Sequence, residues 1–461
     1  MKLPFFYICL AGSAIMMSGL LSSCDNLLDV RSPIDQINSA QVFESTSTAD
    51  AALSNLYAEL QYYSLLNGGS GSAGALLGTY TDELISYDEY NNDADRDLYN
   101  NVQQASNTSI KSFWSNSYKE IYLANSILEG VESSTAIPEN DKKRIRGEAL
   151  FVRSLIFYYL TQVFGDIPYP TSTDFVINQS LPKMSESQIL AVLTDDLKEA
   201  VSLLNDQYTN PERIYPNRKA AQLFLATVLM TQKKDAEAEP LLKEIVQNSM
   251  YVWEGDLSKT FKKNGKHIMW QLKPLNAGDA TNEAVLYYFE DALPYTYTLS
   301  NTLYNSFASN DLRRTQWIKA LTIDQGTYYR SDKYVNTIGN NDEYSIVFRL
   351  EEAYLLLAEA LVNQNKLGEA LPYLNAVKEK AGIELSPAGS SKEQLVNAVI
   401  DENRKQFFTE RGIRFLSLKR AGRLNDLLPS KPNWKDYHLV WPIPRTELLL
   451  NANLNPQNNG Y

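Results

Sequence analysis

Residues 344–382 have the sequence YSIVFRLEEAYLLLAEALVNQNKLGEALPYLNAVKEKAG, which predicts two helices folded against each other. The first half places apolar side chains at helical spacing, at Ile346, Val347, Leu350, Tyr354, Leu357, Ala358 and Leu361. Residues 363–366 end this helix, and a second series follows at Leu367, Ala370, Leu371, Leu374 and Val377, as far as Gly382. We expect Pro372 in the first turn of the second helix, where its missing N–H costs nothing.

The same pattern occurs upstream, between Arg218 and Met250. The matching pairs are Leu225 with Leu357, Ala226 with Ala358, Ala238 with Ala370, Pro240 with Pro372, Leu242 with Leu374 and Ile245 with Val377. In both segments the two alanines are twelve positions apart, Ala226 with Ala238 and Ala358 with Ala370. Small residues at these positions let two antiparallel helices approach closely, as in tetratricopeptide repeats. The alternative is two unrelated hairpins in a helical protein.

The remaining periodicity predicts a mainly α fold, an irregular tetratricopeptide-like scaffold of helical hairpins. We expect helix pairs over about 48–132, 142–205, 218–250 and 344–382. Ser185 with Gln188, and Ser391 with Gln394, form capping boxes at two helix starts. Two long irregular insertions rich in Gly, Tyr, Asn and Asp interrupt the pattern, over about 64–110 and 253–342. Loops of such length in a compact domain are usually functional or disordered.

The composition excludes several classes of function. The net charge is −12 and no basic run is present, which argues against a nucleic-acid partner. The chain has two histidines, His267 and His438, so a multi-histidine metal site is excluded, and neither stands in a recognisable catalytic context. The glycine-rich run 68–74 lacks the Lys-Ser/Thr of a phosphate loop. We therefore expect no metal and no cofactor.

The N-terminal residues have the features of an export signal. Lys2 is followed by an apolar run to Leu20, and then by Leu21-Ser22-Ser23-Cys24, which resembles a bacterial lipoprotein box. We expect residues 1–23 to be removed and Cys24 to carry the lipid, since acyl chains would hold the protein firmly on a bilayer. An ordinary signal peptide with an unrelated cysteine is the alternative. No later run of eighteen apolar residues exists.

Five motifs together resemble the SusD/RagB family of nutrient-binding outer-membrane lipoproteins, over residues 24–461. They are residues 27–29 (LLD); residues 145–150 (IRGEAL) with 164–168 (FGDIP); residues 349–355 (RLEEAYL) with Glu359 and Ala360; Glu410 with Gly412, Arg414, Leu418 and Arg420; and residues 442–444 (PIP) with Glu447, Asn451 and the C-terminal QNNGY. The sequence departs from the family pattern at Asn403, Gln406, Ser417 and Asn459, which affects scaffold positions and not ligand contacts.

The resemblance implies a single domain over residues 24–461 and a role without bond cleavage. Such a protein lies on the outer membrane, exposed at the cell surface. It captures an oligosaccharide or a peptide and acts as a lid that delivers it to a SusC-type TonB-dependent transporter. We interpret five charged residues of these motifs as ion pairs among helices and not as a catalytic set: Arg146, Glu148, Arg349, Glu359 and Arg414.

The resemblance also places the ligand site in the two insertions. The ligand-binding candidates are Tyr80, Tyr87, Tyr90 and Asn92 in the first insertion and Tyr288, Tyr295 and Tyr297 in the second. Aromatic rings suit the C–H faces of sugars, and amide or acid groups suit their hydroxyls. Peptides also pack on tyrosine, so glycan and peptide both stay open as ligands. Two further alternatives are a surface glycoside hydrolase with two carboxylates and a protein-binding repeat adaptor.

Overall fold

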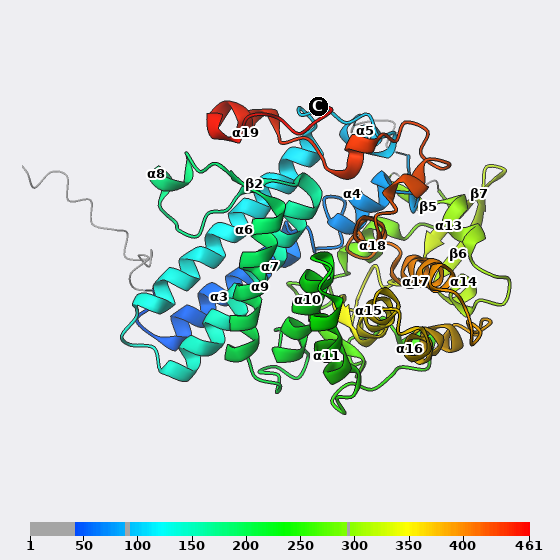
Figure 1. Ribbon diagram of the computed structural model, residues 1–461, viewed down its shortest axis with the longest axis horizontal. Coiled ribbons are helices and arrows are strands. Elements are labelled where there is room, and N and C mark those ends of the chain that lie inside the picture. Colours follow the sequence, from blue (N-terminus) through cyan, green and yellow to red (C-terminus); the bar gives the residue numbers. More distant parts are fainter. Residues whose placement is uncertain (1–41, 88–92, 293–295) are drawn as a thin grey trace, which may run out of the picture. The chain divides into compact units, whose positions relative to one another are not determined.

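The computed structural model describes residues 42–87, 93–292 and 296–461, of which Phe43–Tyr461 form one compact unit (Figure 1). Cys24, Tyr90, Asn92 and Tyr295 lie outside the described residues. Within the described part of the chain, no helix is both long enough and apolar enough to cross a membrane.

Antiparallel helices packed side by side form the larger part of the unit (Figure 1). Each helix packs on the next in the order α3, α6, α7, α9, α10, α11, α15 and α16. The bounds are α3 (Thr46–Tyr62), α6 (Thr108–Ser133), α7 (Glu139–Phe164), α9 (Glu186–Leu203), α10 (Arg218–Thr231), α11 (Asp235–Val246), α15 (Leu350–Asn363), α16 (Leu367–Lys380), α17 (Lys392–Phe407) and α18 (Ile413–Ala421). Every residue of α7 from Gly147 to Phe164 is buried, so α7 is the central helix of this core. Both predicted capping boxes are present.

The predicted repeat is confirmed in its backbone geometry. The turn between α10 and α11 contains Lys233 with φ +62°, and the turn between α15 and α16 contains Asn365 with φ +63°. The next residue makes the same backbone hydrogen bond in both turns. Lys234 N donates to Leu229 O at 2.9 Å, and Lys366 N donates to Leu361 O at 2.8 Å. The four alanines of the pattern, Ala226, Ala238, Ala358 and Ala370, are buried. Helices α10 and α11 therefore form the same supersecondary unit as α15 and α16.

Two details of the 344–382 prediction were wrong. Ile346 and Val347 lie in strand β8 (Ser345–Arg349), which pairs with β4 (Ile268–Leu272). A short apolar run buried on both faces has no period that separates strand from helix. Pro372 is the sixth residue of α16, and Pro240 is the sixth residue of α11. The carbonyl groups that lose a donor there belong to residues 368 and 236, which are exposed to water, so the helix tolerates proline.

The two insertions contain regular elements, contrary to the expectation of long irregular loops. The first holds α4 (Ala73–Tyr80), β1 (Leu84–Ser86) and α5 (Asp93–Tyr99), and the second holds α12 (Asn282–Tyr287), β5 (Tyr297–Leu299), α13 (Asn301–Ser306), α14 (Leu312–Gln316), β6 (Ile318–Ile323) and β7 (Gly326–Ser331). All eight residues of α4 are buried. The apolar side chains of this segment therefore pack in the core as a helix, although the segment is rich in glycine.

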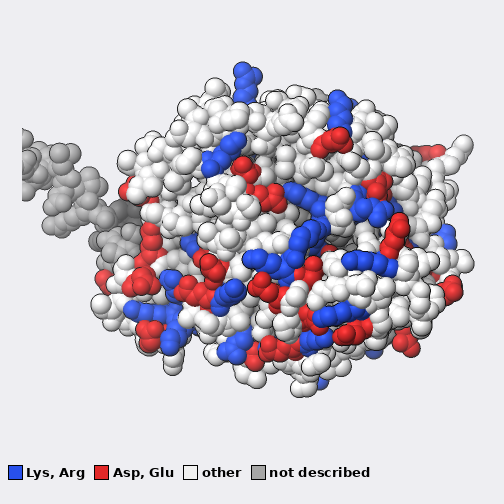
Figure 2. Space-filling view, viewed as in Figure 1, with Lys and Arg blue, Asp and Glu red and all other residues white. Residues whose placement is uncertain are grey.

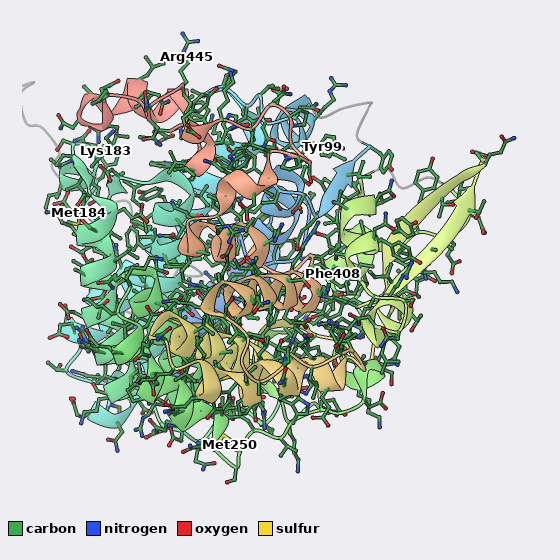
Figure 3. The ribbon with its side chains drawn as sticks, turned by 45° about the vertical axis from the view of Figure 1, so that its right-hand side comes forward. Tyr99, Lys183, Met184, Met250, Phe408 and Arg445 are labelled. Atoms are coloured by element: carbon green, nitrogen blue, oxygen red, sulfur yellow. The ribbon has the colours of Figure 1, made fainter. Side chains whose placement is uncertain are left out.

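Strands from both insertions form one antiparallel sheet in the order β1-β5-β7-β6. Leu84 pairs with Leu299, and Leu299 pairs with Tyr329. A second apolar cluster supports the sheet, including Phe261, Trp317 and Phe408. Figure 3 shows the hairpin of β6 and β7 projecting from the rest of the unit. The sheet thus joins segments that are far apart in the sequence.

The remaining elements are short and lie near the C-terminal segment. They are β2 (Ile167–Pro168), α8 (Phe175–Asn178), β3 (Lys183–Met184) and α19 (Arg445–Leu450). Strands β2 and β3 pair with each other. Asn451 Nδ2 donates to Leu181 O at 2.8 Å, which ties the end of α19 to the segment after α8.

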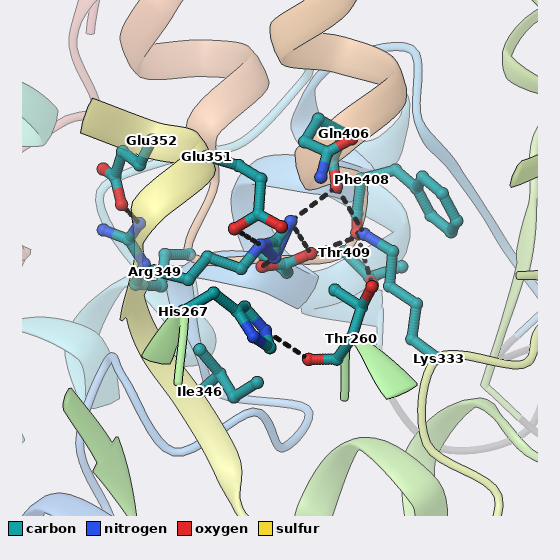
Figure 4. A network of polar contacts seen from close by, with 12 residues as sticks. Thr260, His267, Lys333, Ile346, Arg349, Glu351, Glu352, Gln406, Phe408 and Thr409 are labelled. Atoms are coloured by element: carbon teal, nitrogen blue, oxygen red, sulfur yellow. Dashed lines mark hydrogen bonds and ion pairs between the residues drawn. The ribbon is translucent and has the colours of Figure 1, made fainter. Parts of the chain in front are cut away.

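The interpretation of the five charged residues as scaffold ion pairs is confirmed. The pairs are Arg146 with Glu199 at 2.6 Å, Glu148 with Arg144 at 3.4 Å, Arg349 with Glu410 at 2.8 Å, Glu359 with Arg420 at 2.7 Å and Arg414 with Asp82 at 2.9 Å. Figure 4 shows Arg349 and Lys333 pointing at the backbone of the last turn of α17, where both donate to Gln406 O, at 2.9 and 3.0 Å. Arg349 and Lys333 therefore connect the end of α17 to the strand region.

Candidate functional site

Two of the predicted ligand residues are core residues, so the prediction for them was wrong. Tyr80 has no exposed surface, and its hydroxyl donates to His438 O at 3.0 Å and accepts from Gln103 Nε2 at 3.1 Å. Tyr297 is 2% exposed, and its hydroxyl donates to Asp95 Oδ2 at 2.6 Å. A ring enclosed on all sides cannot lie against a ligand. Burial raises the pKa of Tyr80, in keeping with a neutral structural hydroxyl.

Tyr87 lies at the surface, directly after β1, and is half-buried. Its ring packs against Tyr328 of β7, with ring centroids 5.8 Å apart and an interplanar angle of 69°. Its hydroxyl accepts a long hydrogen bond of 3.4 Å from Thr298 Oγ1, and its backbone N donates to Thr296 O at 2.9 Å. Burial raises the pKa of Tyr87, so the hydroxyl is neutral at physiological pH. The sheet therefore holds this ring in one orientation.

Tyr288, at the end of α12, is the second predicted residue found on this surface. Arg330 of β7 lies under its ring, with the guanidinium carbon 3.9 Å from the ring centroid. Arg330 is itself fixed, since Nε is 2.5 Å from Asp332 Oδ1 and Nη1 donates to Phe289 O at 2.6 Å. The hydroxyl of Tyr288 donates to the Glu290 carboxylate, which raises the pKa of Tyr288. Arg330 and Asp332 thus hold Tyr288 in place.

These residues share one side of the sheet. Tyr328 and Arg330 are two positions apart on β7, so their side chains point to the same face. Tyr329, between them, points to the opposite face, where it stacks on Tyr304 at 3.8 Å and packs against the apolar cluster. We call the surface formed by Tyr87, Tyr288, Tyr328 and Arg330 the aromatic face.

Sequence reasoning missed Tyr328 and Arg330. The alternation in GTYYRS, residues 326–331, is a strand signal that would have separated Tyr328 from Tyr329 by face. The sequence does not show which strands pair with β7. They are β5 and β6, and Tyr87, which contacts Tyr328, comes from the other insertion.

The aromatic face offers ring surfaces and hydroxyl groups, with the Glu290 carboxylate beside the Tyr288 hydroxyl. Among residues 42–87, 93–292 and 296–461, no group of three His, Cys, Asp or Glu side chains could hold a metal ion. Both histidines are buried, and burial lowers the pKa of each. Figure 2 shows acidic and basic side chains interspersed on the visible side of the molecule, with no broad area of one sign. The arrangement favours binding of a neutral, partly apolar ligand.

Several other hollows lie on the described surface, and two of them bear on the function. One is a cleft of about 540 Å³ between α6, α8 and α19, lined mostly by apolar groups such as Trp114, Phe175 and Leu450. The other is a groove of about 480 Å³ between the end of α3 and the loop before α12, lined by Tyr62, Tyr63 and several amides.

Comparisons with known proteins place this geometry in context. A family model described as "Starch-binding associating with outer membrane" matches residues 26–230, and the model of the SusD family matches residues 206–461. A SusD-like protein P2 from Formosa agariphila is 25% identical over 511 aligned residues, covering 96% of this chain and 97% of the relative.

Solved structures share the fold. The chain is similar to a laminarin-binding SusD-like protein, with 20% identity, a TM-score of 0.76, and coverage of 90% of this chain and 99% of that one. It is similar to surface glycan-binding protein A from Bacteroides thetaiotaomicron, solved in complex with laminarihexaose. There the identity is 16%, the TM-score 0.77, and the coverage 90% of this chain and 100% of that one. At such identities the likeness concerns the fold.

Proposed function

The chain belongs to the SusD family, whose model matches more than half of its length, and on that premise we propose that it captures an oligosaccharide at the cell surface. In this role it acts as a lid that delivers the glycan to a SusC-type TonB-dependent transporter, and it breaks no bond. The observation that supports glycan capture most directly is the aromatic face, where Tyr87, Tyr288 and Tyr328 are held by a sheet built from both insertions.

The chemistry of the aromatic face suits a sugar. The C–H faces of pyranose rings pack on aromatic rings, and tyrosine hydroxyls exchange hydrogen bonds with sugar hydroxyls. Because Arg330 and Asp332 already fix Tyr288, little side-chain freedom is lost when a ligand binds. One solved structure of the same fold, surface glycan-binding protein A from Bacteroides thetaiotaomicron, was determined with laminarihexaose, which supports this proposal. Tyr90, Asn92 and Tyr295 stay proposed contributors on sequence grounds alone.

The test is calorimetric titration of the purified protein with laminarihexaose, maltohexaose and other neutral hexasaccharides. Replacing Tyr87→Ala and Tyr328→Ala together should weaken binding at least about tenfold, since each ring contact contributes on the order of 1 kcal/mol. The melting temperature should change little, because both rings are only half-buried. Tyr122→Ala is the matched control, an exposed tyrosine on α6 away from the sheet. Unchanged affinity in the double variant would reject the aromatic face as the site.

A peptide ligand and a hydrolase activity are the alternatives tested alongside. A proteolytic digest titrated in parallel shows a heat signal if the ligand is a peptide. A glycosidase would generate new reducing ends from glycans, whereas a lid generates none. We propose the lid because the aromatic face combines rings with no positioned pair of free carboxylates among its described residues.

Exposed apolar side chains around α8 and α19 support a protein partner. Phe175 is 74% exposed and Leu450 is 79% exposed, and both line the apolar cleft; Tyr122, Val176, Ile177 and Leu449 are also exposed there. An apolar surface of this kind marks a protein or membrane contact. We propose that it contacts the transporter. Co-purification from detergent-solubilised membranes should recover a large β-barrel protein, and Phe175→Ser with Leu450→Ser should reduce the amount recovered.

Anchoring through Cys24 completes the proposal, with a mature domain over residues 24–461. Metabolic labelling with palmitate should mark the wild-type protein and not Cys24→Ala. Surface exposure is tested by protease treatment of intact cells, which should remove the protein without lysis. A labelled Cys24→Ala variant would contradict the anchor, and protection from protease would contradict surface exposure.

A further inference from the structure

The amide-lined groove is separate from the aromatic face. Its walls are the end of α3, the glycine-rich loop 67–71, Asn116 of α6 and residues 274–282. Helix α12 separates the two surfaces: Asn282, its first residue, lines the groove, and Tyr288, just after its last residue, belongs to the aromatic face. The groove has a volume of about 480 Å³ and opens to solvent.

Two exposed aromatic rings form one wall of the groove. Tyr62 is 57% exposed and Tyr63 is 53% exposed, with ring centroids 5.2 Å apart and an interplanar angle of 31°. Neither ring is needed for the apolar core, which α3 reaches through Leu53, Leu56 and Leu60. Both rings are therefore accessible to a molecule in the groove.

Gln61 carries an unused acceptor at the same place. It is only 6% exposed, and its Oε1 has no hydrogen-bond partner among the described residues. An unpaired buried amide oxygen costs on the order of a whole hydrogen bond, so such a group in a native structure needs an explanation. Gln61 lines the groove, and because the oxygen itself is enclosed, the side-chain amide would have to turn for this oxygen to accept a hydrogen bond from a bound molecule.

The side-chain amide nitrogens of three other groove residues already donate hydrogen bonds within the protein. Asn67 Nδ2 donates to Tyr62 O at 2.9 Å, Asn116 Nδ2 donates to Tyr63 O at 3.2 Å, and Asn282 Nδ2 donates to Asn67 O at 2.8 Å. The Oδ1 atoms of Asn116 and Asn282 accept no hydrogen bond from described residues. The groove thus presents mainly acceptors, together with the exposed Asp279 carboxylate.

We propose that this groove is a second oligosaccharide-binding site of the protein. Acceptor oxygens beside two exposed rings match a ligand with many O–H donors and C–H faces, which is the chemistry of a neutral sugar. An anionic ligand is disfavoured because Asp279 and the amide oxygens would repel it. The proposal rests on the glycan-binding function above but uses a different set of residues. Two sites on one protein raise the avidity for a polysaccharide above that for a short oligosaccharide.

The test follows the two sites separately by fluorine NMR of protein labelled with 3-fluorotyrosine. The Tyr62, Tyr63 and Tyr122 resonances are assigned with Tyr→Phe variants. Laminarihexaose, maltohexaose and the other neutral hexasaccharides are then added to the Tyr87→Ala, Tyr328→Ala double variant, in which the aromatic face is disabled. We expect at least one hexasaccharide to shift the Tyr62 and Tyr63 resonances and to leave Tyr122 unchanged.

Gln61→Leu gives a second readout that does not depend on the rings. Removing the unpaired oxygen should not lower the melting temperature, yet it should weaken binding at the groove about tenfold, the effect of one lost hydrogen bond. If hexasaccharides bind the wild-type aromatic face but none shifts Tyr62 and Tyr63, the second site is rejected and the proposed function stands. If none binds at either surface, both proposals fall together.

Discussion

The helical hairpins and the sheet differ in how they are assembled. In α10–α11 and α15–α16, each helix packs on a partner a few residues away, across turns with matching φ values at Lys233 and Asn365. In the sheet, β1 from the first insertion pairs with β5 from the second. Hairpins of the first kind form from local contacts, whereas the sheet orders only when distant segments meet.

The difference separates support from recognition. The hairpins bury their apolar faces against neighbours and leave charged residues at the surface, where Figure 2 shows both signs mixed. The sheet region leaves tyrosine rings at the surface, on strands fixed by a buried cluster. Binding surfaces are commonly carried by segments that a rigid scaffold positions. Buried ion pairs between charged side chains connect the two regions. The predictions below test whether the hairpins support the protein while the sheet region binds the ligand.

The largest effect is expected from breaking the junction at Glu410. Its carboxylate lies 2.8 Å from Arg349 and 2.5 Å from Lys333, and all three side chains are nearly buried. Glu410→Gln leaves the Arg349 charge without its main partner, which should lower the free energy of unfolding by about 3–5 kcal/mol. Urea denaturation measures this change. Exposed Glu393→Gln is the control, and an equal stability of both variants would show that the two regions do not depend on this ion pair.

A pH-dependent effect is expected from Glu83, between α4 and β1. Burial raises the pKa of Glu83 to about 8, although Arg404 and Arg414 oppose the shift. The unfolded chain releases this proton near the ordinary glutamate pKa of 4.5, so the free energy of unfolding falls as the pH rises from about 5 to about 8. The slope is at most about 1.4 kcal/mol per pH unit.

Glu83→Gln should remove that contribution. The variant should therefore gain stability relative to wild type as the pH rises, and the gain should be absent below about pH 5. Denaturation at pH 5, 6.5 and 8 gives the comparison, and the difference between variant and wild type isolates Glu83 from other buried carboxyls such as Glu148 and Glu283. A gain that is constant with pH would mean that Glu83 does not titrate in this range.

The sequence predicted the helical region well and the sheet region poorly, for a physical reason. Helix periodicity and capping are local, so α9 with its Ser185–Gln188 box and the repeated hairpins could be read directly. Strand pairing is not local, and β8 was mistaken for the start of a helix because its apolar run is buried on both sides.

The candidate site shows the same limit. Tyr80 and Tyr87 are seven residues apart in similar sequence, yet Tyr80 is enclosed by Phe415, Trp434 and Trp441 from the other end of the chain. The sequence around Tyr80 does not indicate that these distant residues pack on it. Tyr87 lies at the surface, and its partner Tyr328 depends on a strand pairing that sequence patterns do not specify.

The contrast between Tyr80 and Tyr87 gives a prediction of intermediate size. Tyr80→Phe removes a hydroxyl that bonds His438 O and Gln103 Nε2, so it should lower the free energy of unfolding by about 1–3 kcal/mol. Tyr87→Phe loses only a long bond from Thr298 and should leave stability nearly unchanged. Thermal and urea denaturation of both variants measures the difference. Equal stabilities would mean that Tyr80 does not act as a core residue.

The smallest effect concerns a single turn of the repeat. Asn365 is exposed, makes no side-chain hydrogen bond among the described residues, and has a φ of +63°. Asparagine adopts this left-handed conformation more readily than alanine, so Asn365→Ala should cost about 1 kcal/mol, whereas Asn365→Gly should be neutral or slightly stabilising. Urea denaturation resolves the two, and glycan affinity at the aromatic face should stay the same in both, because the hairpin supports that surface without touching the ligand. A loss of affinity in Asn365→Ala would show instead that the turn is coupled to the sheet, and the division between support and recognition would have to be redrawn there.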